Sequence, residues 1–479
     1  MRAIQRPLHH RSLVELGEML RTREITSTEL VEHFLQRISR LDPVLNAFRV
    51  VCAERARAEA TAADAMLEQG ISLGPLHGLP YAVKDLFDVQ GLPTSAGCRL
   101  LEQSIKQSDC AVVARLRAAG MVLLGKTNTV QFAFGGAGIN HHHGTPHNPW
   151  QARAHLPGGS SSGSAVAVAA GLAPMALGSD TGGSVRIPAA LCGITGLKTT
   201  VGRVSRHGVY PLSQTLDSVG PLCRDAIDSA LVFDVIQGED PADPSTMGKR
   251  RQNSLRLSEG GLRGLRLAVA EGAFFDGVRS EAEARVREAA DTLRGMGANV
   301  TSLRFEEAEL ALQANAGGLV IAAEAYSNNR RLVDEQFDAL DPVVAHRLVK
   351  GRDVRAVDYL QTIEAWRTLR ARTLHELRDV DVLLCPSTLS PALPVDEVDA
   401  SIESYSSANL GTLRNTSIGN VLNLCGLSVP CGFSDGGLPT GLMLYAKPDD
   451  EHLALRVARA FQLETDWHQR TPGLDWVGT

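Results

Sequence analysis

Several features that would place this chain in a common protein class are scarce or missing. Its eight cysteines include no CxxC pair and no Cys/His spacing typical of a metal site. No apolar run approaches the roughly 18 residues of a membrane span, and the first twenty residues lack the apolar core of a signal peptide. A net charge of −6 without a basic stripe argues against nucleic-acid binding. These absences predict a cytoplasmic protein with free thiols that binds neither membrane nor nucleic acid.

Lysine is the other scarce residue. Arginine supplies most of the positive charge, and lysine occurs only at positions 84, 106, 126, 198, 249, 350 and 447. If the reaction needs a lysine as its base, only these few residues are candidates. The remaining composition, 44% hydrophobic and 21% charged over 479 residues, is ordinary for a globular enzyme.

The order of the predicted elements indicates an α/β protein. Apolar residues spaced three and four apart predict a helical apron over residues 1–70, and farther on a helix at 109–120 precedes a buried strand at 121–128. Residues 237–261 are expected to form a linker-like surface loop, and the Ser/Pro/Asp-rich residues 387–410 a long loop. Further strands are predicted at 266–272, 300–305 and 380–386, and helices at 280–296 and over much of 307–377.

Two glycine–serine clusters stand out near the middle of the chain, GGSSSGS at 158–164 and SDTGGS at 179–184. Glycine lets backbone N–H groups approach a ligand closely. Such donors beside hydroxyl groups are what acyl transfer needs, namely a nucleophile and a site for the oxyanion. The alternative is that these are two ordinary loops flanking a buried helix.

Two serines compete as the nucleophile. GSSSG at 159–163 matches a GxSxG nucleophile elbow centred on Ser161, with His346, His375, His452 and His468 downstream, but its lead-in QARAHLPGG is not a strand. Ser184 instead follows the apolar segment APMALG. There, the N–H groups of Thr181, Gly182, Gly183 and Ser184 could form an anion-binding nest. Because His155 is the only histidine in this stretch, a lysine becomes a candidate base.

A histidine-rich loop raises the possibility of a metal site. His141, His142, His143 and His147 lie close together, but consecutive histidines point in different directions and no HxH or HxxxH pairing with carboxylates follows. We therefore interpret them as solvated or substrate-facing and predict no metal.

Several motifs in a fixed order resemble the amidase signature family: GLPYAVKD, GKTN, NPW, PGGSSSGSAVAVAAG, GSDTGGSVRIPA and GLKTTVGRVSR. The resemblance is densest over 75–222. It implies a Ser–cis-Ser–Lys triad with Ser184 as the nucleophile, Ser160 as the bridging serine and Lys84 as the base. It also implies no cofactor and one α/β/α domain over 1–479, with a mixed twisted sheet covered by helices on both faces. A homodimer is compatible with it.

The triad makes demands on Lys84. A lysine normally titrates near 10.4, whereas a useful base titrates near 7–8, so burial must favour the neutral amine. Asp85 and Asp88 would oppose this if they were close, so we predict that their carboxylates point away. Lys126 and Lys198 are interpreted as structural residues that bond backbone carbonyls.

We expect a serine amidohydrolase that cleaves small amides, including aryl amides, carbamates or esters, through an acyl-enzyme on Ser184. One alternative is the glutaminase subunit of a glutamyl-tRNA amidotransferase, which would need a partner to receive ammonia. GTLRNTSIGNVLNLCGLS lacks the carboxylate expected to hold the amino group of glutamine. A non-catalytic binding relative is disfavoured because all three triad positions are intact. Specificity is expected to reside in 130–150, 200–215 and 387–420.

Overall fold

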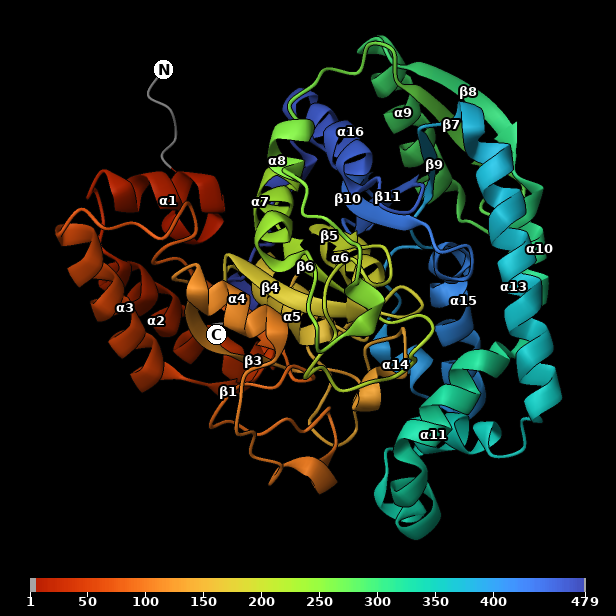
Figure 1. The fold of residues 1–479 in the computed structure, drawn as a ribbon, viewed down its shortest axis with the longest axis horizontal. Helices are drawn as coiled ribbons and strands as arrows, with labels where there is room; N and C mark the ends of the chain where they lie inside the picture. The colour runs from red at the N-terminus through yellow and green to blue at the C-terminus, as the bar shows by residue number, and fades with distance from the viewer. Residues whose placement is uncertain (1–5, 478–479) are drawn as a thin grey trace.

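A computed structural model describes residues 6–477 of the chain. Its centre is an 11-stranded sheet with strand order β1-β3-β2-β4-β6-β5-β10-β11-β9-β7-β8 (Figure 1). The strands are β1 (Phe48–Val51), β2 (Pro80–Lys84), β3 (Val122–Thr127), β4 (Met175–Asp180), β5 (Thr195–Lys198), β6 (Ser218–Cys223), β7 (Arg266–Glu271), β8 (Asn299–Arg304), β9 (Val382–Pro386), β10 (Cys425–Phe433) and β11 (Pro439–Ala446).

The sheet is mixed, as the resemblance implied. Strand β2 lies between β3 and β4 and is parallel to both, and β7 is likewise parallel to β8 and β9. The pairs between these two parallel groups, from β4–β6 to β11–β9, are antiparallel. Strands β2, β3 and β4 are buried along their whole length. Each begins with apolar residues, as parallel strands covered on both faces do, and ends in polar ones: Lys84, Lys126 with Thr127, and Ser179 with Asp180.

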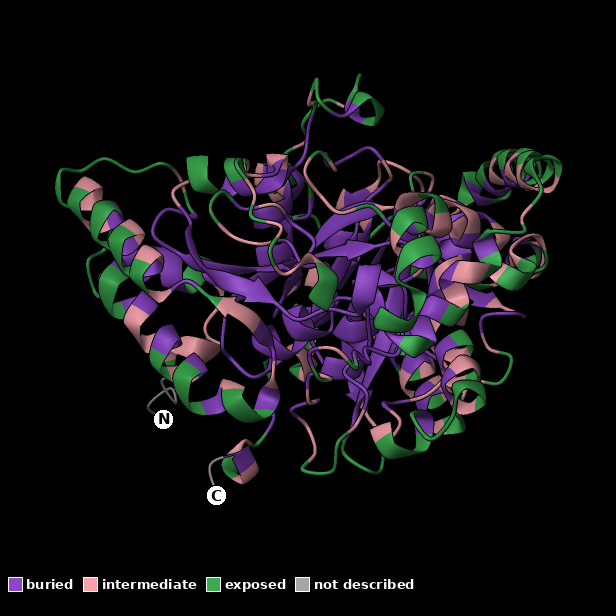
Figure 2. Ribbon diagram, turned by 90° about the horizontal axis from the view of Figure 1, so that it is seen from below, coloured by how far each residue is buried: buried purple, intermediate pink, exposed green. Residues whose placement is uncertain are grey.

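Helices cover both faces of the sheet, and Figure 2 shows the buried strands inside a shell of half-exposed helices. Helices α7, α9 and α16 pack on one face, and α5 and α6 on the other. Figure 1 places α1–α3 at one end and α10, α11 and α13 at the opposite end. The main helices are α1 (Leu13–Arg21), α2 (Ser27–Leu45), α3 (Ala53–Glu68), α4 (Ala111–Ala118), α5 (Ser162–Ala169), α6 (Arg186–Cys192), α7 (Ala226–Ile236), α8 (Ser254–Leu257), α9 (Ser280–Gly295), α10 (Glu306–Ala314), α11 (Leu319–Glu335), α12 (Pro342–Leu348), α13 (Ala356–Glu376), α14 (Val395–Val398), α15 (Ile402–Val421) and α16 (Glu451–Glu464).

One predicted loop is largely wrong, and the other, 237–261, contains the short helix α8 near its end. Residues 387–410 were expected to lack regular structure, but α14 and the first half of α15 lie within them. The Ser/Asn/Thr-rich sequence of α15 has weak intrinsic helix propensity. Ser401 caps its first turn, and residues such as Tyr405 and Asn409 are buried against the rest of the protein. Tertiary packing therefore overrides local preference here.

The predicted thiols agree with the structure, because all eight cysteines are free and buried. Within residues 6–477, no helix is both long enough and apolar enough to cross a lipid bilayer.

Candidate active site

The parallel pairing of β2 and β4 brings two sequence motifs together. Ala82 pairs with Ala176 and Val83 with Leu177, so Lys84 at the end of β2 lies beside the end of β4. The chain leaves β4 at Asp180 and enters α6 at Arg186, so Ser184 lies in the turn that follows the strand. Carboxyl ends of neighbouring parallel strands are the usual location of a site in an open α/β sheet.

Lys84 is completely buried and contacts two hydroxyl groups. Its Nζ lies 2.7 Å from Ser160 Oγ and 2.9 Å from Ser179 Oγ. Burial lowers the pKa of Lys84 to about 7, although the carboxylates of Asp217 and Asp180 act in the opposite direction. The lysine therefore has the neutral amine of a base available near neutral pH.

The neighbouring carboxylates point away from Lys84, as predicted. Because successive strand residues face opposite sides, Asp85 lies on the other side of the sheet. There it pairs with Lys126 at 2.6 Å, while Asp88 pairs with Lys106 at 3.4 Å. Lys126 also donates to the Pro93 carbonyl, which supports its structural role.

Lys198, the other lysine interpreted as structural, is bonded to backbone carbonyls as expected. It donates to the carbonyls of Thr199 at 2.9 Å and Leu424 at 3.0 Å.

The two glycine–serine clusters meet at Ser160 and Ser184. The Gly159–Ser160 peptide bond is cis, in agreement with the resemblance. The Ser161 N–H donates to the Ser184 carbonyl at 3.2 Å, which holds the two clusters against each other. Ser184 itself is buried, with 4% of its surface exposed. The structure thus brings Lys84 into contact with Ser160, and Ser184 into contact with the residue that follows Ser160, from three separate segments.

Asp180 shapes the turn that carries Ser184. Its carboxylate accepts the N–H groups of Gly183 at 3.0 Å and Val185 at 3.1 Å. Burial disfavours the charge on Asp180, but the Arg186 guanidinium beside it holds the pKa of the carboxyl below its usual range. Gly183 has φ +134°, and an added Cβ would lie 2.1 Å from Thr416 Oγ1, so the turn needs glycine there. Because the Gly183 N–H already donates to Asp180, the remaining candidate donors to an oxyanion are the N–H groups of Thr181, Gly182 and Ser184.

The Asp180–Arg186 pair gives a stability prediction. Arg186→Leu would leave a buried carboxylate without its cation, and we expect a loss of about 3–5 kcal/mol in the free energy of unfolding. Urea unfolding would measure it. Arg153→Leu is the matched control, because Arg153 pairs with Asp396 at the surface and we expect no measurable change there. An unchanged urea midpoint for Arg186→Leu would contradict the prediction.

A cavity of about 520 Å³ reaches the turn at Thr181 and Gly182. Its walls come from residues 312–350 and 406–421, and they carry three cationic side chains, Arg347, Lys350 and Arg414. No aspartate or glutamate contributes to its lining. Asn409 and Asn420 add neutral polar groups. The cavity is thus positively charged on one side and adjoins the candidate oxyanion donors on the other.

The histidine-rich loop around His141 contacts two aspartates, Asp341 and Asp399, from segments near this cavity. His141 contacts Asp341 at 2.9 Å and Asp399 at 3.0 Å, and these two carboxylates raise the pKa of His141 to about 9. Asp341 caps α12, which carries Arg347. In the described part of the chain, no group of three or more histidine, cysteine or acidic side chains is arranged to hold a metal ion. We therefore assign this loop a structural role.

Comparison with known protein families shows to which enzyme family this chain belongs. The amidase family model matches residues 29–455, and the chain therefore belongs to this family. It is a hydrolase of amide C–N bonds. The chain is 38% identical to the A subunit of the glutamyl-tRNA(Gln) amidotransferase of Roseiflexus sp., over 98% of this chain and 99% of that protein. It is also 38% identical to a 2-amino-5-chloromuconic acid deaminase of Comamonas testosteroni, over 94% of this chain and 95% of that protein.

A solved structure agrees with the fold over nearly the whole chain. It comes from the inhibitor-bound form of a vestigial protein complex described as revealing the evolutionary origins of an s-triazine catabolic enzyme, and it matches with a TM-score of 0.88 and 34% identity. The match covers 95% of this chain and 98% of that chain. The amidase fold is thereby established.

Sequence reasoning did not single out four residues that the structure places around this site. Asp180 and Arg186 lie inside the recognised motif, so their opposite charges six residues apart were an available signal. Arg347 and Arg414 come from distant segments with no motif of their own, and only the fold brings them to one cavity.

Proposed function

We propose that this chain is an amidohydrolase with a Ser184–Ser160–Lys84 triad that acts without a partner protein on small amides bearing a carboxylate. The observation that carries the substrate class is the cationic cavity beside Thr181 and Gly182. The triad is supported by the 2.7 Å contact between Lys84 and Ser160 and by the lowered pKa of the lysine.

The proposed reaction has two steps. The Lys84 lone pair accepts the Ser160 hydroxyl proton, Ser160 accepts the proton of Ser184, and Ser184 Oγ attacks the amide carbon. The N–H groups of Thr181, Gly182 and Ser184 would stabilise the oxyanion. When the C–N bond breaks, Ser160 passes a proton to the leaving nitrogen and recovers one from Lys84. Water then attacks the acyl-enzyme along the same proton route and regenerates Ser184.

Two cavity arginines are suited to hold a carboxylate. Arg347 donates to the Phe134 carbonyl at 2.6 Å and lies over the Phe134 ring at 4.0 Å, which fixes the guanidinium. Burial lowers the pKa of Arg347, and a bound anion would offset that cost. Arg414 donates to the Asp276 backbone carbonyl and also pairs with the Asp276 carboxylate at 3.6 Å. A fixed guanidinium forms short, strong hydrogen bonds to a carboxylate.

The same cavity weighs against glutamine as the substrate. Glutamine carries an ammonium group, which a carboxylate would hold best, whereas the lining combines three cationic side chains with no aspartate or glutamate. Many relatives are named as subunits of an amidotransferase, so this alternative is kept as an outcome of the test. The named substrate of the Comamonas relative is a carboxylic acid, in keeping with the proposal.

The test uses amides that differ only in one end group. Succinamate, butyramide and β-alaninamide carry a carboxylate, a methyl and an ammonium group at the same distance from the amide. We expect kcat/KM for succinamate to exceed that for the other two by about tenfold or more, because a charge-assisted hydrogen bond contributes about 1.5–3 kcal/mol. Ammonia release by the purified chain would be measured.

Arg347→Gln and Arg414→Gln should lower kcat/KM for succinamate and leave that for butyramide nearly unchanged. Arg352→Gln is the matched control, since Arg352 pairs with Asp334 and is not among the residues that line the cavity. Equal turnover of all three amides, or a preference for β-alaninamide, would overturn the substrate class. Activity only on glutamine, or only after a partner is added, would favour the role of an amidotransferase component.

A further inference from the structure

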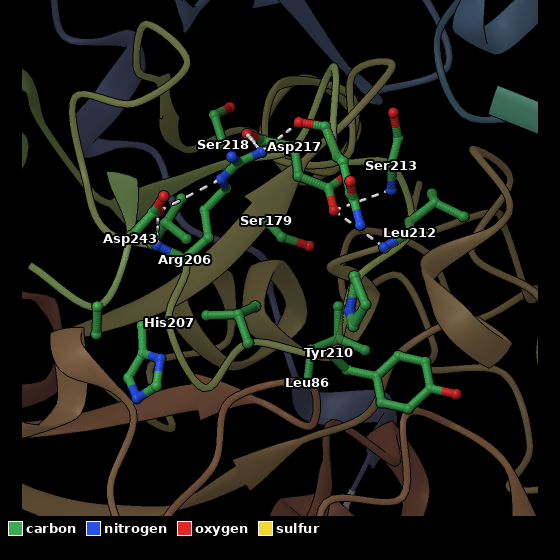
Figure 3. Close-up of a pocket in the computed structure, with 15 residues that line it drawn as sticks. Leu86, Ser179, Arg206, His207, Tyr210, Leu212, Ser213, Asp217, Ser218 and Asp243 are labelled. Atoms are coloured by element: carbon green, nitrogen blue, oxygen red, sulfur yellow. Dashed lines mark hydrogen bonds and ion pairs between the residues drawn. The ribbon is translucent and has the colours of Figure 1, made fainter. Parts of the chain in front are cut away.

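A second cavity lies next to Lys84. It has a volume of about 210 Å³ and is bounded by β4, β6 and the loop 206–217. Figure 3 shows the Ser179 hydroxyl pointing into it, among Tyr210, Leu212 and Asp217. The volume has room for several water molecules. Ser179 therefore lies between this cavity and Lys84, whose Nζ is 2.9 Å away.

The triad alone does not decide in which direction the lone pair of neutral Lys84 points. A neutral amine has two N–H donors and one lone pair. For the lysine to accept a proton from Ser160, its lone pair must point toward Ser160 Oγ, 2.7 Å away. An N–H must then point elsewhere, and in this buried site it needs an acceptor. Ser179 Oγ is at hydrogen-bond distance from Nζ.

We propose that Ser179 is a positioning residue for the amidase reaction: its hydroxyl oxygen accepts an N–H of neutral Lys84 and so turns the lysine lone pair toward Ser160. The opposite arrangement, in which Ser179 donates to the lone pair, would block the base. Water in the second cavity offers the Ser179 proton another acceptor and favours the productive arrangement. This proposal rests on the triad of the proposed function.

The arrangement has the same logic as the carboxylate that orients a catalytic histidine, but here a neutral hydroxyl orients an amine. Ser179 precedes Asp180, so the strand that holds the nucleophile turn also holds this acceptor in place. Their side chains point to opposite sides of β4, one to Lys84 and the other to Arg186.

The test does not depend on the unknown substrate. A small alkyl fluorophosphonate reacts with an activated serine: the Ser184 Oγ–P bond forms, the P–F bond breaks, fluoride leaves, and the serine proton passes through Ser160 to Lys84. The second-order labelling rate would be measured by intact-protein mass from pH 5 to 9. In the wild type it should rise to a plateau with a midpoint near pH 7, where Lys84 loses its proton.

For Ser179→Ala we expect two changes. The plateau should fall by about ten- to a hundredfold because the base is no longer oriented. The midpoint should also move to lower pH, because the lost hydroxyl no longer accepts a hydrogen bond from the charged lysine. Ser179→Thr keeps the hydroxyl, and the adjoining cavity has room for its methyl group, so its plateau should stay within about threefold of the wild type.

Ser164→Ala is the matched control. Ser164 is as deeply buried and bonds to the same strand, through the Leu177 carbonyl at 3.1 Å, but it contacts Thr127 rather than the lysine. Its plateau and midpoint should match the wild type.

Three results would overturn the role of Ser179: an unchanged rate in Ser179→Ala, a lower plateau with an unmoved midpoint, or a Ser179→Thr rate as low as that of Ser179→Ala. A wild type that is not labelled at Ser184 would overturn the proposed function itself, and the role of Ser179 with it. Thermal melting of each variant would identify any that fails to fold.

Discussion

Ser184→Ala is expected to abolish amide hydrolysis, with kcat falling by about four orders of magnitude or more. Loss of a nucleophile removes the covalent pathway and leaves only binding and oxyanion stabilisation. Ammonia release from the best amide of the succinamate series would measure the loss. The variant should fold normally, because the side chain removed is small.

Ser161→Ala is the informative control for this result. Ser161 stands at the centre of the GxSxG match, and in the structure its hydroxyl donates to the Ser179 carbonyl at 3.3 Å. It should retain most of the activity. If Ser161→Ala were inactive and Ser184→Ala active, the nucleophile would have to be reassigned.

Lys84→Met is expected to lower kcat by about three orders of magnitude or more while making the protein more stable. The activity is lost because methionine accepts no proton. The stability is gained because the pKa of Lys84 falls from 10.5 to about 7 on folding, which means that the folded state disfavours the lysine charge. At about 1.36 kcal/mol per pKa unit, the gain is at most about 5 kcal/mol, and lost hydrogen bonds to Ser160 and Ser179 reduce it.

The pH dependence of this gain has a definite sign. Below pH 7 the lysine is charged in both the folded and unfolded states, so the wild type bears the full cost. That cost shrinks as pH rises from about 7 toward 10.5, where the unfolded lysine also loses its proton. Urea unfolding at pH 6 and pH 9 would show a larger advantage for Lys84→Met at pH 6. A variant that is less stable than the wild type at pH 6 would contradict the argument.

The sequence predicted the parts of the site that lie within continuous motifs. Lys84 ends a short apolar strand and Ser184 follows another, but it was the resemblance to the amidase signature motifs that assigned them as base and nucleophile. Strands β7, β8 and β9 were predicted close to their observed bounds, and helices α1, α2 and α3 lie within the predicted helical apron.

Other parts depended on contacts that no local pattern encodes. Helix α15 has polar residues on its buried side, where Asn415 and Asn420 bond to groups from distant segments. Strand β1 is only four residues long and pairs at the sheet edge, and no strand was predicted at β5 or β6. The orientation of Ser179 toward Lys84 follows from strand register, which the sequence does not specify.

The division of the active-site region between two parts of the chain has a consequence for how such enzymes diversify. The residues proposed for bond cleavage lie between 84 and 184, whereas the charged wall of the large cavity comes from α12, α15 and the residues around them. Substitutions in the later part can reverse the charge offered to a ligand without touching the strands that hold Lys84 and Ser184. This chain is 38% identical to one relative named as part of an amidotransferase and to another named as a deaminase. Both names are in keeping with residues for bond cleavage that stay the same while the residues that contact the ligand change.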